Sequence, residues 1–292
     1  MIRGILAPFA ATALAFSLSA GPANAESYSF QKLDINKADE TVLVGIAKYT
    51  ILGWDQPSEG PPNCYLINGT ARVPLADPKG VATYCEGIND AGAVVGYYEN
   101  SANVAIGFTY ANGVFTDFSL SNGAPFPLPL AISDTGAITG YYYDVHNNPV
   151  GFILKATGVL ATFRIPGMTN IFPVGINKTY QVTIQTFDGG GNLHAFLRRG
   201  SALTELAYPG AVLTSISKLN NQGQAVGTYV DNAGGHHGFV YDSAKAAYYT
   251  IDFPGMASTA LNGINDKETL VGDFRRAAGS PREGLKAVGS LP

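Results

Sequence analysis

Residues 87–98, GINDAGAVVGYY, place an Asn-Asp-Ala-Gly turn between two apolar segments. Asn and Asp side chains bond nearby backbone groups, and glycine takes the positive φ of a tight turn, so this stretch predicts a β-hairpin. Close variants of this turn recur along the chain. The apolar residue before the turn stands at positions 88, 132, 176, 219 and 264, in steps of 44, 44, 43 and 45. A period of about 40–50 residues built from short strands is typical of a β-propeller.

Each repeat predicts four strands, named a to d. Strand a precedes the turn, strand b follows it, strand c carries a Gly-Phe or Ala-Phe pair, and strand d often ends at proline. The pair Gly45-Ile46 supplies a first, less obvious copy and brings the number of markers to six. We therefore predict an all-β, six-bladed β-propeller of four-stranded antiparallel blades. A β-sandwich is the alternative, but it would not require such regular spacing.

Two details of the repeat give further expectations. A glycine recurs in strand b at positions 53, 96, 140, 227 and 272, and we expect it to let an aromatic ring of the neighbouring blade approach the backbone. The fourth copy lacks that glycine, and Tyr180 replaces the turn glycine, so its a–b turn is expected to be altered.

The two ends of the chain are expected to meet in one blade. After strand c of the last copy the chain reaches Pro292, which leaves no residues for a strand d. Near the N-terminus, residues 32–35 resemble residues 250–253, and each segment stands at the same distance before a strand a. We predict that residues 28–35 pair with residues 284–288 as an outer strand that closes the ring.

The first 25 residues resemble a secretory signal peptide. Arg3 is followed by an apolar segment, and Ala23-Asn24-Ala25 fits a cleavage site. We expect cleavage after Ala25, a single propeller domain over residues 26–292, and a secreted or periplasmic location. No later segment approaches ~18 apolar residues, so no membrane span is expected.

The chain has 18 basic and 22 acidic residues without a basic cluster, which argues against a nucleic-acid partner. A monomer is expected.

The two cysteines, Cys64 and Cys85, are expected to form a disulfide in an oxidising compartment. It would join strand c of the first repeat to strand a of the second. Two free buried thiols are the alternative.

The triplets His194-Ala195-Phe196 and His237-Gly238-Phe239 resemble the bacterial extracellular HAF-repeat family. The resemblance covers the mature chain and implies a secreted, propeller-like repeat protein of mostly unassigned function. The matching positions Ile106, Val150 and Glu283 lack the histidine, which argues against a shared catalytic role for it.

Candidate binding residues lie where the b–c and d–a loops share one face. Acidic residues recur at the b–c turns. We favour the interpretation that they cap these turns; the alternative is a ring of carboxylates that binds Ca²⁺ or sugar hydroxyls. The histidines lack zinc-site spacing, so neither a metal nor a cofactor is expected. Trp54 either stacks on a sugar or packs between blades. The candidate ligand-binding residues are Trp54, Asp144, Asp188, Asp231 and His236.

These features favour a secreted or periplasmic binding module for a protein or glycan partner. One alternative is a polysaccharide-active hydrolase or lyase with its site at the channel mouth, because a site assembled from distant blades leaves no local motif. Another is a structural envelope protein without a ligand. An enzyme is the less favoured reading, and no catalytic residue is assigned.

Overall fold

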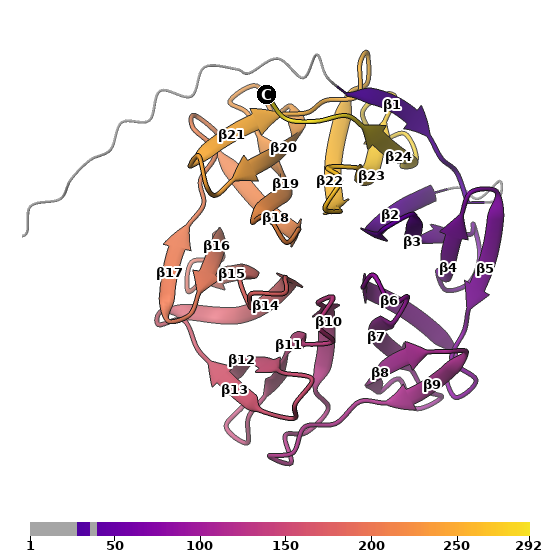
Figure 1. Ribbon diagram of the computed structural model, residues 1–292, viewed down its shortest axis with the longest axis vertical. Helices are drawn as coiled ribbons and strands as arrows, with labels where there is room; N and C mark the ends of the chain where they lie inside the picture. The colour runs from indigo at the N-terminus through magenta and orange to yellow at the C-terminus, as the bar shows by residue number, and fades with distance from the viewer. Residues whose placement is uncertain (1–27, 36–39) are drawn as a thin grey trace, which may run out of the picture.

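The computed structural model describes residues 28–35 and 40–292, and every regular element in them is a β-strand. The strands lie around a common centre, with β2, β6, β10, β14, β18 and β22 innermost (Figure 1). The predicted signal peptide lies outside the described residues. In the described part of the chain, no helix is long and apolar enough to cross a membrane.

Four blades are separate antiparallel sheets of four strands, in which consecutive strands pair. Their strands are β2 (Glu40–Ala47), β3 (Thr50–Gln56), β4 (Asn63–Asn68), β5 (Ala71–Leu75), β6 (Ala82–Ile88), β7 (Val94–Glu99), β8 (Ala105–Ala111), β9 (Val114–Asp117), β10 (Leu128–Ile132), β11 (Ile138–Tyr143), β12 (Pro149–Leu154), β13 (Leu160–Phe163), β14 (Met168–Ile176), β15 (Val182–Asp188), β16 (Leu193–Arg199) and β17 (Ala202–Glu205).

The remaining strands form one eight-stranded sheet, which corrects the prediction of six separate blades. Two antiparallel halves join because β20 and β22 pair in parallel at His236 and Ser258. The period of the sequence does not show whether two successive repeats hydrogen-bond to each other. The strands of this sheet are β1 (Ser29–Lys32), β18 (Leu213–Leu219), β19 (Gln224–Val230), β20 (His236–Asp242), β21 (Ala247–Thr250), β22 (Ser258–Ile264), β23 (Leu270–Arg275) and β24 (Glu283–Val288).

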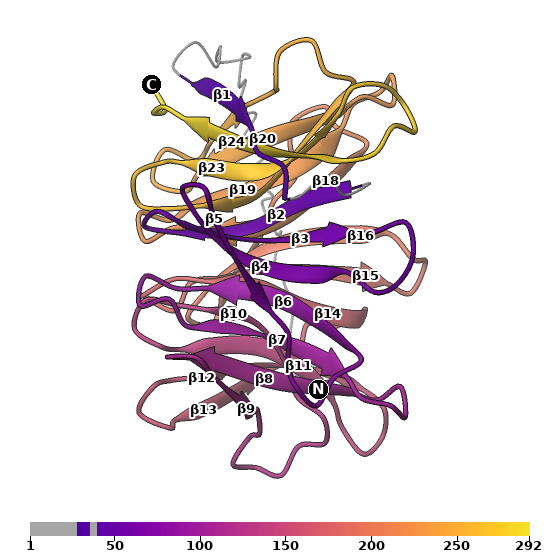
Figure 2. The same ribbon diagram turned by 90° about the vertical axis from the view of Figure 1, so that its right-hand side faces the viewer.

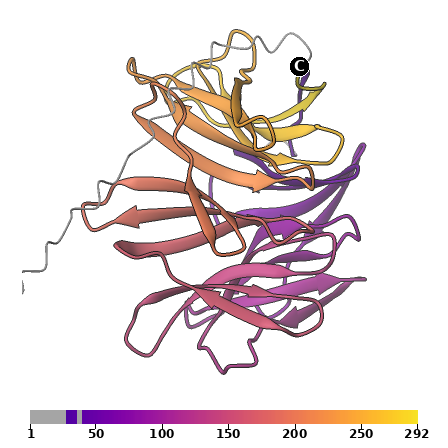
Figure 3. The ribbon, with the colours of Figure 1, turned by 60° about the vertical axis from the view of Figure 1, so that its left-hand side comes forward.

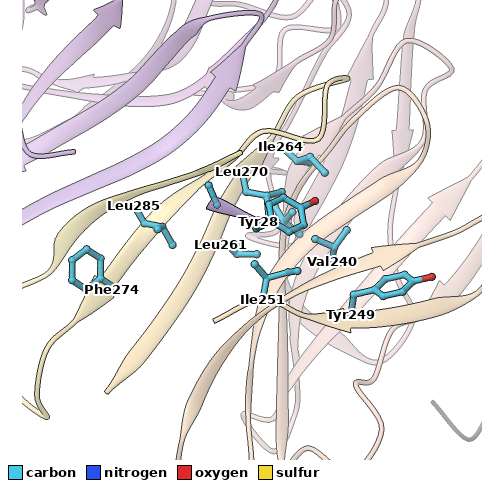
Figure 4. Close-up of a cluster of buried hydrophobic side chains, with 11 residues drawn as sticks. Tyr28, Val240, Tyr249, Ile251, Leu261, Ile264, Leu270, Phe274 and Leu285 are labelled. Carbon is cyan, nitrogen blue, oxygen red and sulfur yellow. The ribbon is translucent and has the colours of Figure 1, made fainter. Parts of the chain in front are cut away.

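The N-terminal strand β1 pairs with the C-terminal strand β24, as predicted. The register runs antiparallel from Ser29 opposite Val288 to Lys32 opposite Leu285. In Figure 2 the two strands lie side by side at one edge of the molecule. Tyr28 and Leu285 belong to the hydrophobic cluster that fills this part of the sheet (Figure 4). The pairing covers the edge of β24 and ties the two ends of the described chain together.

Apolar side chains between neighbouring sheets form the core. The recurring strand-c phenylalanines are among the buried residues, and Phe108, Phe152 and Phe239 are fully buried. Figure 3 shows how the sheets face one another around the ring. Cys64 and Cys85 form the predicted disulfide, which links the β2–β5 and β6–β9 blades.

A β-bulge recurs near the end of each inner strand. In β6 the register shifts between Cys85 and Gly87, which leaves Glu86 without a partner residue on β7. The strand-b glycines lie against these bulged strands. A Cβ on Gly96 would overlap the backbone carbonyl of Tyr84. The group closest to Gly96 is therefore the backbone of its own blade. The prediction that an aromatic ring of the neighbouring blade approaches this glycine is wrong.

The a–b turn of the fourth copy is not altered, contrary to prediction. Tyr180 adopts a positive φ of 61°, the conformation that glycine takes in the related turns. Its amide donates to the Asn177 carbonyl at 3.0 Å, and Asn177 Oδ1 accepts the amides of Thr179 and Gln181. The asparagine and the turn hydrogen bonds impose the geometry without glycine.

Candidate functional site

The centre of the ring has two different ends. We call the end with the a–b turns the turn end (residues 48–49, 89–93, 133–137, 177–181, 220–224 and 265–269). The end with the b–c loops is the loop end (residues 57–62, 100–104, 144–148, 189–192, 231–235 and 276–282). A cavity of about 60 Å³ lies among the turn-end residues, and one of about 380 Å³ lies between β2, β3 and β6.

Side-chain amides bridge successive turns at the turn end. Asn177 Nδ2 donates to the Asn220 carbonyl at 3.1 Å, and Asn220 Nδ2 donates to the Asn265 carbonyl at 3.2 Å. Asn221 Nδ2 reaches both Asp134, at 2.6 Å, and Asp266, at 2.8 Å. These polar groups bond one another and hold the turns together, so little donor or acceptor capacity remains for a ligand.

The larger cavity, here called the Trp54 cavity, combines aromatic and polar groups. Its lining residues are Val44, Trp54, Gln56, Pro62, Thr83, Tyr84, Cys85 and Glu86. The disulfide between Cys64 and Cys85 fixes one wall, because Cys64 pairs with Trp54 across β3 and β4. Its volume lies in the range of small-molecule sites, about 300–1,000 Å³.

Glu86 stands at the bulge of β6 and lines the Trp54 cavity. Burial raises the pKa of its carboxyl group, and the Lys218 ammonium acts in the opposite direction. Its charge in turn contributes to the raised pKa values of Tyr97 and Tyr141, after the larger effect of their burial. Glu86 is therefore near two further aromatic residues, Tyr97 on β7 and Tyr141 on β11.

Lys218 crosses the centre of the ring at the level of the bulges. The related positions carry Gly45, Gly87, Ala131, Gly175 and Gly263, so β18 alone presents a long side chain there. Its Nζ donates to the carbonyls of Leu130, at 2.9 Å, and Val174, at 2.5 Å. Burial lowers the pKa of Lys218 to about 8, while Glu86 raises it. Lys218 thus satisfies two bulge carbonyls and connects three inner strands.

A second polar group lies beside the Trp54 cavity. The Arg282 guanidinium stands 4.9 Å from the centroid of the Trp54 ring and pairs with Glu40 through Nη2 at 2.7 Å. Asp273, whose carboxyl pKa is raised by burial, accepts from Asn262 Nδ2 at 3.0 Å. The charge of Arg282 is therefore paired with that of Glu40, and its guanidinium covers one face of Trp54.

The predicted acidic residues of the b–c loops cap their own turns. Asp144 accepts the amides of His146 and Asn148, both at 2.9 Å, and contacts Arg164 at 2.6 Å. The amide of Asn148, with Arg164 and His146, lowers the pKa of Asp144 to about 2. Asp188 and Asp231 cap the corresponding turns in the same way.

The HAF-like histidines join these caps to the outer strands. His237 lies 3.2 Å from Asp231 and 2.7 Å from Asp252, measured between ring nitrogen and carboxylate oxygen. His194 makes the equivalent pair of contacts with Asp188 and Glu205. These contacts give the histidines a structural role. His236 is exposed at the start of β20. In residues 28–35 and 40–292, no three His, Cys, Asp or Glu side chains converge in metal-ligating geometry.

Of the sequence-predicted site residues, only Trp54 lines the larger cavity. Asp144, Asp188, Asp231 and His236 lie at b–c loops and strand ends of other repeats, outside the lining of this cavity. Sequence reasoning missed Glu86, Tyr84 and Lys218. A signal was present in the alignment of the repeats, since Glu86 is the one charged residue at a position that carries Val44, Leu130, Val174, Ser217 and Asn262 in the other inner strands.

Solved β-propellers resemble this chain at low identity. The β-propeller domain of the Trilobed protease from Pyrococcus furiosus, described as an open velcro topology, matches with a TM-score of 0.55 and 8% identity, over 86% of this chain and 95% of that chain. A candidate gluconolactonase matches with a TM-score of 0.54 and 11% identity, over 90% of this chain and 92% of that chain. The SapL1 lectin in complex with α-methyl fucoside matches with a TM-score of 0.53 and 11% identity, over 87% of this chain and 97% of that chain.

These identities show the fold alone. No protein-family model and no curated protein sequence matches the chain. The β-propeller fold is therefore established, while the resemblance to the HAF-repeat family gains no support from these comparisons.

Proposed function

We propose that this protein is a binding module for a glycan, which it holds in the Trp54 cavity. The observation that carries the proposal is the composition of that cavity, with Trp54 and Tyr84 beside the polar groups of Gln56 and Glu86. Aromatic rings stack on the apolar C–H face of a sugar, and amide and carboxylate groups bond its hydroxyls. A pocket that is mostly apolar with a few placed polar groups is typical of small-ligand sites.

The surrounding structure supports this use. The cavity is built on strands of two blades, and the Cys64–Cys85 disulfide and the Arg282–Glu40 pair hold its walls. A wall held in place before binding lowers the ordering cost of binding. One protein of similar fold is a lectin, which shows that a β-propeller can carry a sugar site.

The test uses Trp54, which is the one tryptophan of the chain. A panel of oligosaccharides is titrated against intrinsic fluorescence, and hits are measured by calorimetry. Trp54→Ala is expected to lower affinity at least about tenfold, because stacking on the ring is lost. Tyr49→Ala, which removes an aromatic side chain 68% exposed at the turn end, is the matched control and should bind normally. A silent panel, or equal binding by Trp54→Ala, would contradict the proposal.

A hydrolase or lyase acting on a glycan is a second candidate. Glu86 and Asp273 are both carboxyl groups whose pKa is raised by burial, which is a property of general acids. Release of reducing ends from a polysaccharide that is lost in both Glu86→Gln and Asp273→Asn would establish this alternative.

A further inference from the structure

Glu86 is a charged residue of the Trp54 cavity that has no bonded partner. In the described part of the chain its carboxylate forms no hydrogen bond and no ion pair. Asn262 stands at the corresponding bulge of β22 and donates to both the Leu43 carbonyl and Asp273. The same backbone position can thus be fully satisfied, and in β6 it is not. A carboxylate left unbonded in a partly buried site costs stability, which suggests that an external partner completes it.

The nearby cations are already held by other groups. The Lys218 ammonium donates to the carbonyls of Leu130 and Val174, and it acts on Glu86 only at a distance. Arg282 is bound to Glu40 through two nitrogens, Nε at 3.0 Å and Nη2 at 2.7 Å. Neither side chain reaches the Glu86 carboxylate within ion-pair distance. The carboxylate therefore faces the cavity without a close positive charge.

Aromatic rings lie near Glu86 in the cavity. Tyr84 stacks on Tyr97 with ring centroids 4.7 Å apart, and Trp54 lines the same cavity as Tyr84 and Glu86. Glu99, at the end of β7, adds a second negative charge that acts on both tyrosines. The faces of aromatic rings attract cations, by about 2 kcal/mol when the cation is desolvated. Aromatic faces and carboxylates together favour a positively charged group.

From this arrangement we infer that the ligand carries a protonated amine, and that the glycan bound in the Trp54 cavity contains amino sugars with free amines. This inference rests on the proposed glycan-binding function. The ammonium would lie against Glu86, and the aromatic rings of Trp54 and Tyr84 would contact the sugar and the cation. N-acetylation would remove the charge, and a neutral hydroxyl in its place would supply a weaker hydrogen bond.

The experiment compares three β-1,4-linked hexasaccharides with the same backbone, built from glucose, N-acetylglucosamine and glucosamine. Each is titrated near neutral pH against the wild-type chain, Glu86→Gln and Glu59→Gln. Glu59 is exposed and outside the cavity lining, so its variant changes the net charge equally. Calorimetry reports affinity, Trp54 fluorescence reports occupancy of the cavity, and thermal melting checks the fold.

We expect the glucosamine oligomer to bind at least about tenfold tighter than the other two, as a charge-assisted hydrogen bond predicts. Glu86→Gln should remove that preference and Glu59→Gln should keep it. Equal affinity for all three oligomers would overturn this inference and leave the glycan-binding function standing. Preference for the amine that survives in Glu86→Gln would also overturn it. Absence of binding by all three would reject the inference, and the glycan function would then depend on its own wider panel.

Discussion

The two ends of the propeller use polar residues in opposite ways. At the turn end, asparagine and aspartate side chains bond the neighbouring turns, as Asn220 does with Asn265. In the Trp54 cavity, which extends to Pro62 of the loop end, Glu86 stands beside aromatic rings without a bonded partner in the described residues. The first arrangement stabilises the ring, and in our proposal the second leaves a group for an external molecule. The recurrent turn asparagines have a structural role, whereas we propose a function for a polar residue that stays unbonded.

The ends also differ in what holds them. Hydrogen bonds connect the turns around the turn end, whereas the Trp54 cavity is held by a disulfide and an ion pair. The covalent link joins the two blades that line the Trp54 cavity. Removing the turn-end hydrogen bonds and the links of the Trp54 cavity in separate experiments should therefore distinguish effects on stability from effects on binding.

The largest expected effect is loss of the Cys64–Cys85 disulfide. Its cysteines are 21 positions apart, and the chain-entropy account gives about 3 kcal/mol for a loop of this size. Urea unfolding of the same protein with and without a reducing agent measures the difference. Reduction should also alter Trp54 fluorescence before unfolding, because Cys64 pairs with Trp54. An unchanged unfolding free energy would show that the link does not hold the loop end.

The turn end should respond to loss of one recurrent asparagine. Asn220 is 4% exposed, accepts the amides of Gln222 and Gln224 and donates to the Asn265 carbonyl. Asn220→Ala should lower the free energy of unfolding by about 2 kcal/mol, because buried donors and acceptors lose their partner. Asn232→Ala, at an exposed loop-end position, is the control. A cost no greater than that of the control would refute the structural role of the turn end.

A smaller effect concerns the pH dependence of stability. The Glu205 carboxylate, with Asp188, raises the pKa of His194; at His237, the Asp252 and Asp231 carboxylates outweigh the opposing effect of burial and raise the pKa. A folded-state pKa above the unfolded value of about 6.5 means that this stabilisation is complete below pH ~6.5. It is lost as the pH rises through the folded-state value.

Unfolding free energies measured across this range should therefore show a difference between wild type and His194→Gln/His237→Gln that shrinks as the pH rises. Each partly exposed pair contributes less than about 1 kcal/mol. A difference that is independent of pH would show that the histidines act through packing alone.

The smallest expected effect on stability is that of Glu86→Gln. The carboxylate has no bonded partner among the described residues, so its replacement should leave the free energy of unfolding unchanged or raise it slightly. Chemical unfolding in parallel with Asn220→Ala gives a direct comparison of the two ends. A loss above about 1 kcal/mol would mean that Glu86 serves the fold through Lys218.

Much of the fold could be predicted because the repeat fixes local geometry. The turn asparagines, the strand-c phenylalanines, the pairing of β1 with β24 and the disulfide all follow from spacing and residue type. The joining of two repeats into one sheet could not be predicted, because it depends on a contact between His236 and Ser258 in different repeats. The period carries no information on that distance.

The candidate site was less accessible to sequence reasoning. Acidic residues at the b–c turns drew attention because they recur, and they cap their turns. Glu86 and Lys218 are each the one charged residue at their position in the repeat, and they lie at bulges of inner strands in the linings of two different cavities. The two residues are far apart in the sequence and act on each other electrostatically through the closed ring, and no local motif records that.

The central claim, that the loop end binds the ligand, is tested most directly by acrylamide quenching of Trp54. The protein is measured with and without a saturating concentration of an oligosaccharide whose binding has been established by calorimetry. Occupancy of the Trp54 cavity predicts a clear decrease in quenching, since the bound sugar would cover the ring. Quenching that stays unchanged while calorimetry shows saturation would place the ligand elsewhere and contradict the account.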